Sequence, residues 1–291
     1  MDNEELTLFR DMAHRALEAE ISPHIEQWEA QHSVPRELWH TLGQAGLLCP
    51  DMPEEYGAAG TTPEVTFAVI EEMSRLGFGG IASGYSIHSN IVAPYIEHFG
   101  TEEQKSQWLP KMVTGEALGA LAMTEPSAGS DVQSIRTKAV KDGDEWILNG
   151  SKIFITNGML ADIVIVAAIT DPGKGAKGTS LFIVDATLPG FARGKKIEKM
   201  GQHTSDTAEL FFQDVRLPAS SLLGELNKGF VIMMTELPRE RLGIAAQAVA
   251  AAEGALDITV DYVLERKAFG QTIASFQNTR FTLAEVKTEI A

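Results

Sequence analysis

The sequence predicts an α+β protein with an amino-terminal all-α domain, a middle antiparallel β domain and a carboxy-terminal helical bundle. Three observations carry this prediction. Apolar residues recur at helical spacing before Gly119, β-rich runs with hairpin signals follow it, and helical character returns from Gly229. We therefore expect three domains, at residues 1–119, 120–226 and 227–291.

The first helical run covers residues 4–28, where apolar side chains recur on one helix face. We expect a bend at Pro23, because proline lacks the N–H group that a helix interior uses. A second helix is predicted from Pro35 to near Gly46, where glycine favours termination.

The next helix starts have clear capping signals. Thr62 is a predicted cap with Pro63 in the first turn, and this helix ends before Gly77. Residues 101–104, Thr-Glu-Glu-Gln, have the form of a capping box that starts a further helix after Gly100. The first domain is therefore predicted to be entirely helical.

Two hairpin signals begin the β domain. Asp142-Gly143 separates the predicted strands 137–140 and 145–148, and Asn149-Gly150 is expected to turn the chain into a strand at 152–156. Further strands are predicted at residues 163–169, 179–185 and 208–215.

The last region is helical. Apolar residues at helical spacing from Leu242 to Val263 indicate one long helix whose alanines permit close packing. Another helical pattern reaches Ala291 with no glycine, proline or polar tail after it. Amphipathic helices need partners for their apolar faces, so we expect an incomplete bundle, finished by further residues or by another subunit.

Composition excludes several classes of function. Lys and Arg number 24 against 40 Asp and Glu, and the resulting net charge of −16 argues against a general nucleic-acid binder. The single cysteine, Cys49, cannot close an internal disulfide, and acidic residues stand where a signal peptide would be cationic, so a cytoplasmic location is predicted. The longest apolar run, residues 163–169, is strand-sized, so no integral membrane segment is expected.

Three motif-like features are better explained by structure than by chemistry. Residues 173–178 match G-x-G-x-x-G, but they lead into a predicted strand, which favours an inter-strand loop over dinucleotide binding. Residues 125–129 lack the first glycine of a nucleophile elbow, because Glu125 stands there. The seven histidines include no H-E-x-x-H, and we predict no metal site.

A dense group of hydroxyls and small residues, 123–131, lies between the helical and β regions. Such a segment forms turns that expose backbone amides and hydroxyls to a ligand. On composition alone, a polar interdomain linker is an equal alternative.

This segment is the first of four motifs that occur in order along essentially the whole chain. Together they resemble the acyl-CoA dehydrogenase family, whose α-β-α architecture is the one predicted above. The motifs are Thr124-Glu125-Pro126-x-Ala128-Gly129-Ser130-Asp131, Asn149-Gly150-x-Lys152-x-x-Ile155-Thr156-Asn157-Gly158, Met200-Gly201 through Ser205-Asp206-Thr207, and Glu265-Arg266-Lys267-Ala268-Phe269-Gly270.

The resemblance implies an FAD site between the β domain and the carboxy-terminal helices. Met123 and Thr124 would hydrogen-bond the pyrimidine side of the flavin, and Thr156 would lie close to N5. Phe154 would pack near the ring face, whereas without the resemblance it is more simply a core residue of a strand. Ser130 would contact a flavin phosphate or the pantetheine arm of the substrate.

The family also forms homodimers or homotetramers in which one subunit completes the cofactor site of its neighbour. Arg266, Phe269 and Gln277 match positions that lie near the neighbour's FAD. Without the resemblance, Arg266 would be explained by helix-dipole compensation or by a surface ion pair.

Glu240 matches the position of the catalytic base in long-chain and isovaleryl-type members of the family. Pro238 suits a first helical turn, which would place Glu240 near a helix amino terminus, where the dipole and the neighbours Arg239 and Arg241 favour the carboxylate. Burial acts in the opposite direction. The alternative is one half of a surface Glu-Arg pair. Arg239 and Arg241 are further candidates for substrate binding, with helix ordering as the other role of Arg241.

The resemblance therefore implies FAD-dependent α,β-dehydrogenation of an acyl-CoA thioester to the trans-2-enoyl-CoA, as in fatty acid β-oxidation. Electrons would pass to an electron-transferring flavoprotein, with an oxygen-using oxidase as a close variant. A different class of function stays open, in which the chain is a binding or assembly module without turnover.

Overall fold

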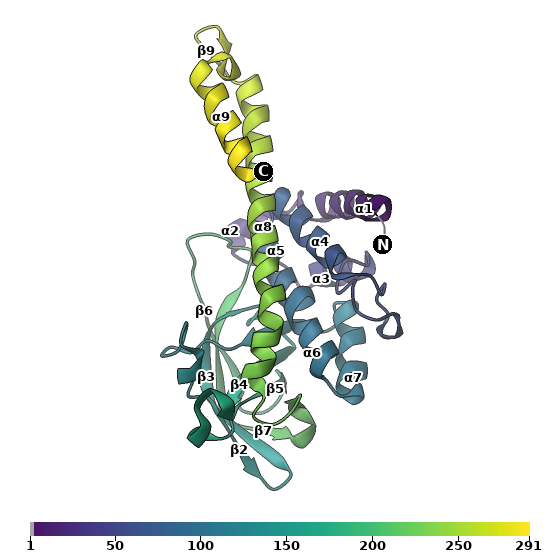
Figure 1. The fold of residues 1–291 in the computed structure, drawn as a ribbon, viewed down its shortest axis with the longest axis vertical. Coiled ribbons are helices and arrows are strands. Elements are labelled where there is room, and N and C mark those ends of the chain that lie inside the picture. Colours follow the sequence, from purple (N-terminus) through teal and green to yellow (C-terminus); the bar gives the residue numbers. More distant parts are fainter. Residues whose placement is uncertain (1–2) are drawn as a thin grey trace.

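The computed structural model describes residues 3–291 and has the predicted order of helices, sheet and helices (Figure 1). The long helix α8 runs along the molecule, with the amino-terminal helices and the sheet beside its first part. The amino-terminal helices are α1 (Asn3–Ile21), α2 (Ile25–Gln31), α3 (Glu37–Gln44), α4 (Pro63–Arg75), α5 (Gly79–Tyr85), α6 (Ala93–Phe99) and α7 (Glu102–Val113).

The helix starts predicted at Thr62 and Thr101 are confirmed, the helix predicted from Pro35 begins at Glu37, and the first run has a break in place of a bend. The run predicted at 4–28 is two helices, α1 and α2, separated around Pro23. Thr62 is the N-cap of α4 in extended conformation, with Pro63 in the first turn. The capping box of α7 is present, because Thr101 Oγ1 accepts from the Gln104 backbone N–H at 3.3 Å and the Gln104 side chain accepts from the Thr101 N–H at 3.0 Å.

A π-helical segment at Ser86–Val92 joins α5 to α6, which the sequence pattern does not reveal. It is buried on most sides and packs against both α8 and β1. π-Helical turns inserted between α-helical segments are frequent at functional sites.

The β domain is one mixed sheet in the order β6-β7-β3-β2-β4-β5-β8, with β1 also paired to β4. Its β1–β4 pair is parallel, whereas the prediction was antiparallel throughout. Strands at 163–169 and 179–185 are confirmed, and residues 172–178 form short 3₁₀ turns that lead into β5, as expected for a loop. The strands are β1 (Gly119–Ala122), β2 (Lys138–Asp142), β3 (Glu145–Thr156), β4 (Ile163–Ile169), β5 (Thr179–Asp185), β6 (Phe191–Lys196), β7 (Thr207–Pro218) and β8 (Leu222–Leu223).

The hairpin predicted at Asn149-Gly150 is wrong, because β3 continues through both residues. The pairing of β3 with β7 shifts register there, so the extra residue is accommodated as a bulge. Gly150 has a φ of 152°, and an added Cβ would lie 2.3 Å from Thr137 Oγ1. The glycine therefore permits close strand approach rather than a chain reversal.

The strand β4 separates two apolar cores. Ile163, Ile165 and Ala167 pack with the helical domain, whereas Val164 and Val166 pack within the β domain. Alternate side chains of a strand point to opposite faces, so a continuous apolar run is what burial on both faces requires.

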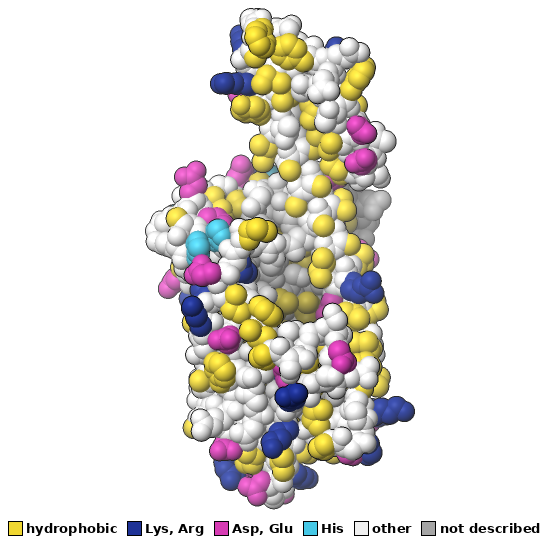
Figure 2. All heavy atoms as spheres, turned by 90° about the vertical axis from the view of Figure 1, so that its left-hand side faces the viewer, with side chains coloured by type: hydrophobic (Ala, Val, Ile, Leu, Met, Phe, Trp, Pro, Cys, Tyr) yellow, Lys and Arg dark blue, Asp and Glu magenta, His cyan; other side chains and the backbone are white. Residues whose placement is uncertain are grey.

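The helix α8 (Gly229–Glu265) packs against α4 and the π-helical segment over its first part, and its second part pairs with α9 (Gln277–Ile290). This α8–α9 hairpin stands clear of the body in Figures 1 and 2, with hydrophobic side chains on its surface. Among residues 3–291, α8 is the helix whose length and apolar composition would allow a membrane span, although that test is also passed by core helices of soluble proteins.

Candidate active site

The Glu240 side chain is buried on α8, facing α6. Its exposed fraction is 8%, and the Tyr95 hydroxyl donates to Oε1 at 2.8 Å. Burial raises the pKa of Glu240 above the usual glutamate range, the hydrogen bond from Tyr95 opposes this, and the negative charge of Glu236 adds to it. A carboxylate in this setting is a stronger base than an exposed one.

The surroundings of Glu240 differ from those expected. Because α8 begins at Gly229, Glu240 lies in its fourth turn and the helix-dipole argument does not apply. Pro238 is inside the helix rather than in its first turn. The Arg239 guanidinium does not pair with Glu240. It donates to Asp51 Oδ2 at 2.5 Å and to Asn90 Oδ1 at 3.0 Å.

Arg241 is exposed, so the two arginines next to Glu240 have different environments. The ion pair of Arg239 with Asp51 favours a helix-ordering role for Arg239. Burial against Tyr95 shows that Glu240 is not one half of a surface Glu-Arg pair, so that alternative is wrong.

The predicted flavin contacts lie on two adjacent segments of the β domain. Met123 and Thr124 follow β1, and the Ile153 backbone N–H donates to Thr124 O at 3.0 Å, which brings them beside Phe154. Thr156 ends β3 opposite Thr207. The structure thus places Met123 and Thr124 beside the last part of β3, the strand that carries Phe154 and Thr156.

Phe154 projects from a second bulge in β3, where the register with β7 shifts between Lys152 and Ile155. Its φ is 60° and its exposed fraction is 61%, so it is not the core residue that a plain strand would contain. An exposed aromatic side chain on the same strand as the half-buried Thr156, with the half-buried Thr124 on the adjoining segment, is compatible with a planar heteroaromatic ring such as a flavin.

Sequence reasoning missed the roles of Lys152 and Glu125. The wholly buried Lys152 ammonium donates to Glu125 Oε1 at 2.8 Å and to Met123 O at 2.9 Å. Glu125 also accepts from the backbone N–H groups of Arg136 and Thr137. Burial lowers the pKa of Lys152 to about 8. A lysine at an inward position of β3 was the available signal.

Other predicted residues lie elsewhere. Ser130 is exposed on the loop after β1, and Arg266, Phe269 and Gln277 are exposed around the tip of the α8–α9 hairpin. In Figure 1 this tip, marked by β9 (Lys267–Ala268), is at the opposite end of the molecule from the β domain. Within one chain, Arg266, Phe269 and Gln277 therefore lie far from Phe154.

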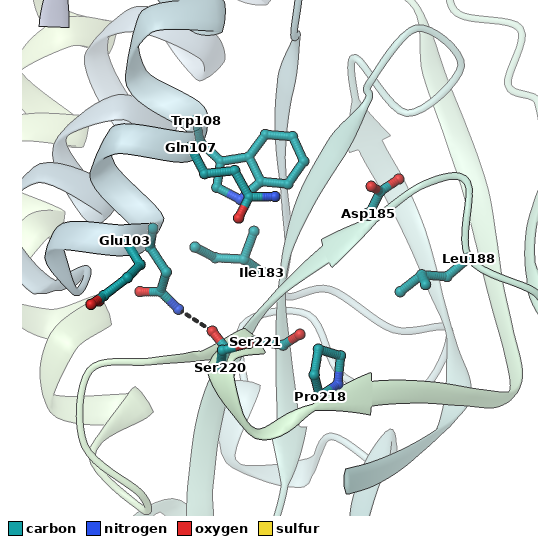
Figure 3. A pocket seen from close by; sticks show the side chains of 10 residues that line it. Glu103, Gln107, Trp108, Ile183, Asp185, Leu188, Pro218, Ser220 and Ser221 are labelled. Carbon is teal, nitrogen blue, oxygen red and sulfur yellow. Dashed lines mark hydrogen bonds between the residues drawn. The ribbon is translucent and has the colours of Figure 1, made fainter.

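A separate pocket lies between α7 and the β domain (Figure 3). Trp108 and Ile183 form its apolar wall, and the Gln104 amide donates to Ser220 O at 2.7 Å at its edge. None of the predicted site residues lines it, and its contacts join the two domains.

The fold and the buried glutamate define a three-part acyl-CoA dehydrogenase architecture. Family models for the N-terminal, middle and C-terminal domains of acyl-CoA dehydrogenase match residues 3–116, 120–215 and 227–291. This chain belongs to the acyl-CoA dehydrogenase family.

Similar proteins agree with this assignment. Rat mitochondrial long-chain specific acyl-CoA dehydrogenase is 49% identical over 97% of this chain, and the chain spans 66% of that relative's length. The crystal structure of acyl-CoA dehydrogenase from Geobacillus kaustophilus has a TM-score of 0.95 and 47% identity, covering 100% of this chain and 76% of that one. A Mycobacterium smegmatis glutaryl-CoA dehydrogenase in complex with FADH2 has a TM-score of 0.92 and 33% identity, covering 100% and 73%.

Proposed function

We propose that this chain carries out FAD-dependent α,β-dehydrogenation of an acyl-CoA thioester to the trans-2-enoyl-CoA. The observation that carries the proposal is Glu240, a buried carboxylate on α8 at the family's base position. The glutaryl-CoA dehydrogenase bound to FADH2 supports FAD as the cofactor, because it shares the whole fold described here.

The residues of this chain have separate tasks in the proposed reaction. Glu240 removes the α-proton of the thioester and holds it on its carboxylate. Bound FAD would accept the β-hydrogen as hydride. Thr124 and Thr156, held by the β1 and β3 backbones, would supply hydroxyl contacts to the flavin from fixed positions, which avoids reorganisation during the reaction.

Met123 and Phe154 complete the flavin contacts in this proposal, and Ser130 contacts a flavin phosphate or the pantetheine arm. Arg241, exposed one residue after the base, is a candidate for binding the acyl-CoA, whereas Arg239 contributes through its ion pair with Asp51.

The proposal includes a homodimer or homotetramer, because the exposed hairpin tip suits contact with a neighbouring subunit's FAD. Arg266, Phe269 and Gln277 are its contact residues. An electron-transferring flavoprotein is the proposed electron acceptor. We also propose domain limits at 119/120 and 226/227, and a cytoplasmic location, supported by the single buried thiol of Cys49.

A visible spectrum and an anaerobic titration test this function. The chain, mixed with FAD and freed of excess, should be yellow and should bleach when acyl-CoA thioesters are added without oxygen. Flavin binding without bleaching by short, long or branched acyl-CoA would contradict the enzymatic proposal and favour a binding or assembly module. The Glu240→Gln variant is the control, because it should bind flavin and fail to bleach.

A further inference from the structure

Two carboxylates of α8 face two hydrogen-bond donors of α6. Glu236 and Glu240 are four residues apart, so they lie on one face of α8. Tyr95 and His98 are three residues apart on α6, which packs against that face. The Tyr95 hydroxyl donates to Glu240 at 2.8 Å, and His98 Nδ1 lies 2.8 Å from Glu236 Oε1.

Both carboxylates are shielded from water, whereas the histidine reaches the surface. The exposed fractions are 5% for Glu236 and 8% for Glu240, and Tyr95 is fully buried. The His98 side chain is 44% exposed, and its Nε2 lies 3.0 Å from Glu97 Oε2. The protonation of His98 therefore responds to bulk pH, while its partner carboxylate lies one turn from Glu240.

We propose that Tyr95 is a positioning residue for the Glu240 carboxylate, and that the His98–Glu236 ion pair controls how readily Glu240 accepts a proton. This inference rests on the proposed function only where it concerns turnover, because the contacts of Tyr95 and His98 are made between side chains of this chain and need no bound cofactor.

The hydroxyl of Tyr95 has one donor hydrogen, and it is directed at Glu240. That donor stabilises the anionic carboxylate and fixes its Oε1, so the base is held in one orientation before substrate arrives. Burial and the nearby carboxylates raise the pKa of Tyr95 far above the usual range, so the hydroxyl keeps its proton at neutral pH.

The pair one turn away acts through charge. The hydrogen bond to Glu236 raises the pKa of His98, although partial burial opposes it. The other charged groups next to His98 are Glu97 on its own helix and Arg239 on α8, and Arg239 is paired with Asp51. Protonated His98 neutralises Glu236; neutral His98 leaves an uncompensated negative charge that disfavours ionised Glu240.

These contacts predict opposite shifts for different variants. Tyr95→Phe removes a donor to the anion, so the Glu240 titration midpoint moves to higher pH. His98→Gln leaves Glu236 without a cationic partner and moves the midpoint in the same direction. Glu236→Gln removes the neighbouring anion and moves it to lower pH. A merely structural contact would not produce shifts of both signs.

The test is a ¹³C NMR titration of the full chain labelled at glutamate side-chain carboxyl carbons. The Glu240 resonance is identified by its absence in Glu240→Gln. Tyr56→Phe is a matched control. The Tyr56 hydroxyl donates to Glu102 Oε2 at 3.4 Å, a contact that does not involve α8, so removing this hydroxyl should leave the Glu240 midpoint unchanged. Unchanged midpoints in both Tyr95→Phe and His98→Gln would overturn the inference, and the exposed His98 site keeps the test valid if Tyr95→Phe fails to fold.

Anaerobic flavin reduction by an acyl-CoA separates this inference from the proposed function. In Tyr95→Phe, flavin reduction by the acyl-CoA should be about tenfold slower, because the Glu240 carboxylate is no longer held in one orientation toward the substrate. If the midpoints shift but acyl-CoA thioesters do not reduce the flavin bound to the unchanged chain, the proposed function fails and the inferred control of Glu240 stands. If Glu240→Gln is inactive while Tyr95→Phe and His98→Gln both match the unchanged chain in Glu240 midpoint and in reduction rate, the inference fails and the proposed function stands.

Discussion

Lys152 and Glu125 form an ion pair inside the β domain, with 2.8 Å between Nζ and Oε1 and side-chain exposures of 0% and 4%. The lysine also donates to Met123 O, so Lys152 holds β3 against residues on both sides of Thr124. This contact fixes the relative position of the two segments expected to hold the flavin.

Lys152→Met should destabilise the protein, because it leaves the Glu125 carboxylate buried without its cationic partner. Loss of one partner from a buried pair lowers the free energy of unfolding by about 3–5 kcal/mol. Urea unfolding at pH 7 measures this change. Lys174→Met is the control, since Lys174 pairs with Asp171 at the surface and exposed pairs contribute about 0–1 kcal/mol. Equal losses in the two variants would contradict the structural role of Lys152.

Glu240→Gln should lower turnover by at least about 10²-fold with flavin binding retained, in line with the loss of a general base.

In the unchanged protein, turnover should rise with pH through a midpoint above the usual glutamate range, because only ionised Glu240 accepts a proton and burial raises its pKa. Steady-state rates of the unchanged chain and of the variant, measured as a function of pH, test both effects. More than a tenth of the activity in the variant would show that another group removes the proton.

Arg239 and Arg241 provide a matched pair of substitutions two residues apart. Arg239→Ala should lower the free energy of unfolding by about 3 kcal/mol, because Asp51 is buried and loses its charged partner. Arg241→Ala should leave stability unchanged within about 0.5 kcal/mol, since its side chain is exposed, and should weaken acyl-CoA binding. Thermal or urea unfolding and an acyl-CoA titration distinguish the two, and a reversed order would refute the assignment.

The sequence predicted the α-β-α order and the β4 and β5 strands because these depend on local periodicity. It failed at Asn149-Gly150, where a turn signal is overridden by pairing of β3 with β7. It also misplaced the start of α8, because Pro238 suits a first turn locally but tertiary packing continues the helix from Gly229.

The same distinction holds for the site. Thr124, Phe154 and Thr156 were predicted as flavin contacts from motifs, and the structure places Thr124 beside the β3 segment that carries the other two. The Tyr95 partner of Glu240 was not predicted. That contact joins positions 145 residues apart, and no local pattern in either helix reports it. Long-range partners of buried polar groups require the fold itself.

Arg266→Lys should reduce both flavin retention and the oligomeric state, because a lysine cannot copy the two-pronged hydrogen bonding of a guanidinium to a diphosphate. This prediction is based on the position of Arg266, which is exposed at the hairpin tip near Phe269, a side chain that is 97% exposed. Gel filtration with the flavin-to-protein absorbance ratio measures the effect. Arg280→Lys, also exposed but on α9, is the control. A monomer with full flavin content would refute the proposed contact between subunits.

Cys49 should resist alkylation in the folded chain, although it is the single thiol. Its side chain is fully buried, its Sγ donates to Ser89 Oγ at 3.7 Å, and burial raises its pKa to about 12. Because the thiolate is the reactive form, labelling by iodoacetamide at pH 8 should be slower than for a free thiol by about 10³-fold or more.

The labelling rate of Cys49 also tests the ion pair between Arg239 of α8 and Asp51. Asp51 lies two residues after Cys49, so Arg239→Ala should loosen this turn and raise the labelling rate, whereas Arg241→Ala should not. Mass spectrometry of timed samples measures the rates. Local opening, rather than intrinsic thiol chemistry, then sets the rate, since neither substitution touches the sulfur. Rapid labelling of the unchanged chain, or equal rates in the two variants, would show that the Asp51–Arg239 contact does not close this part of the fold.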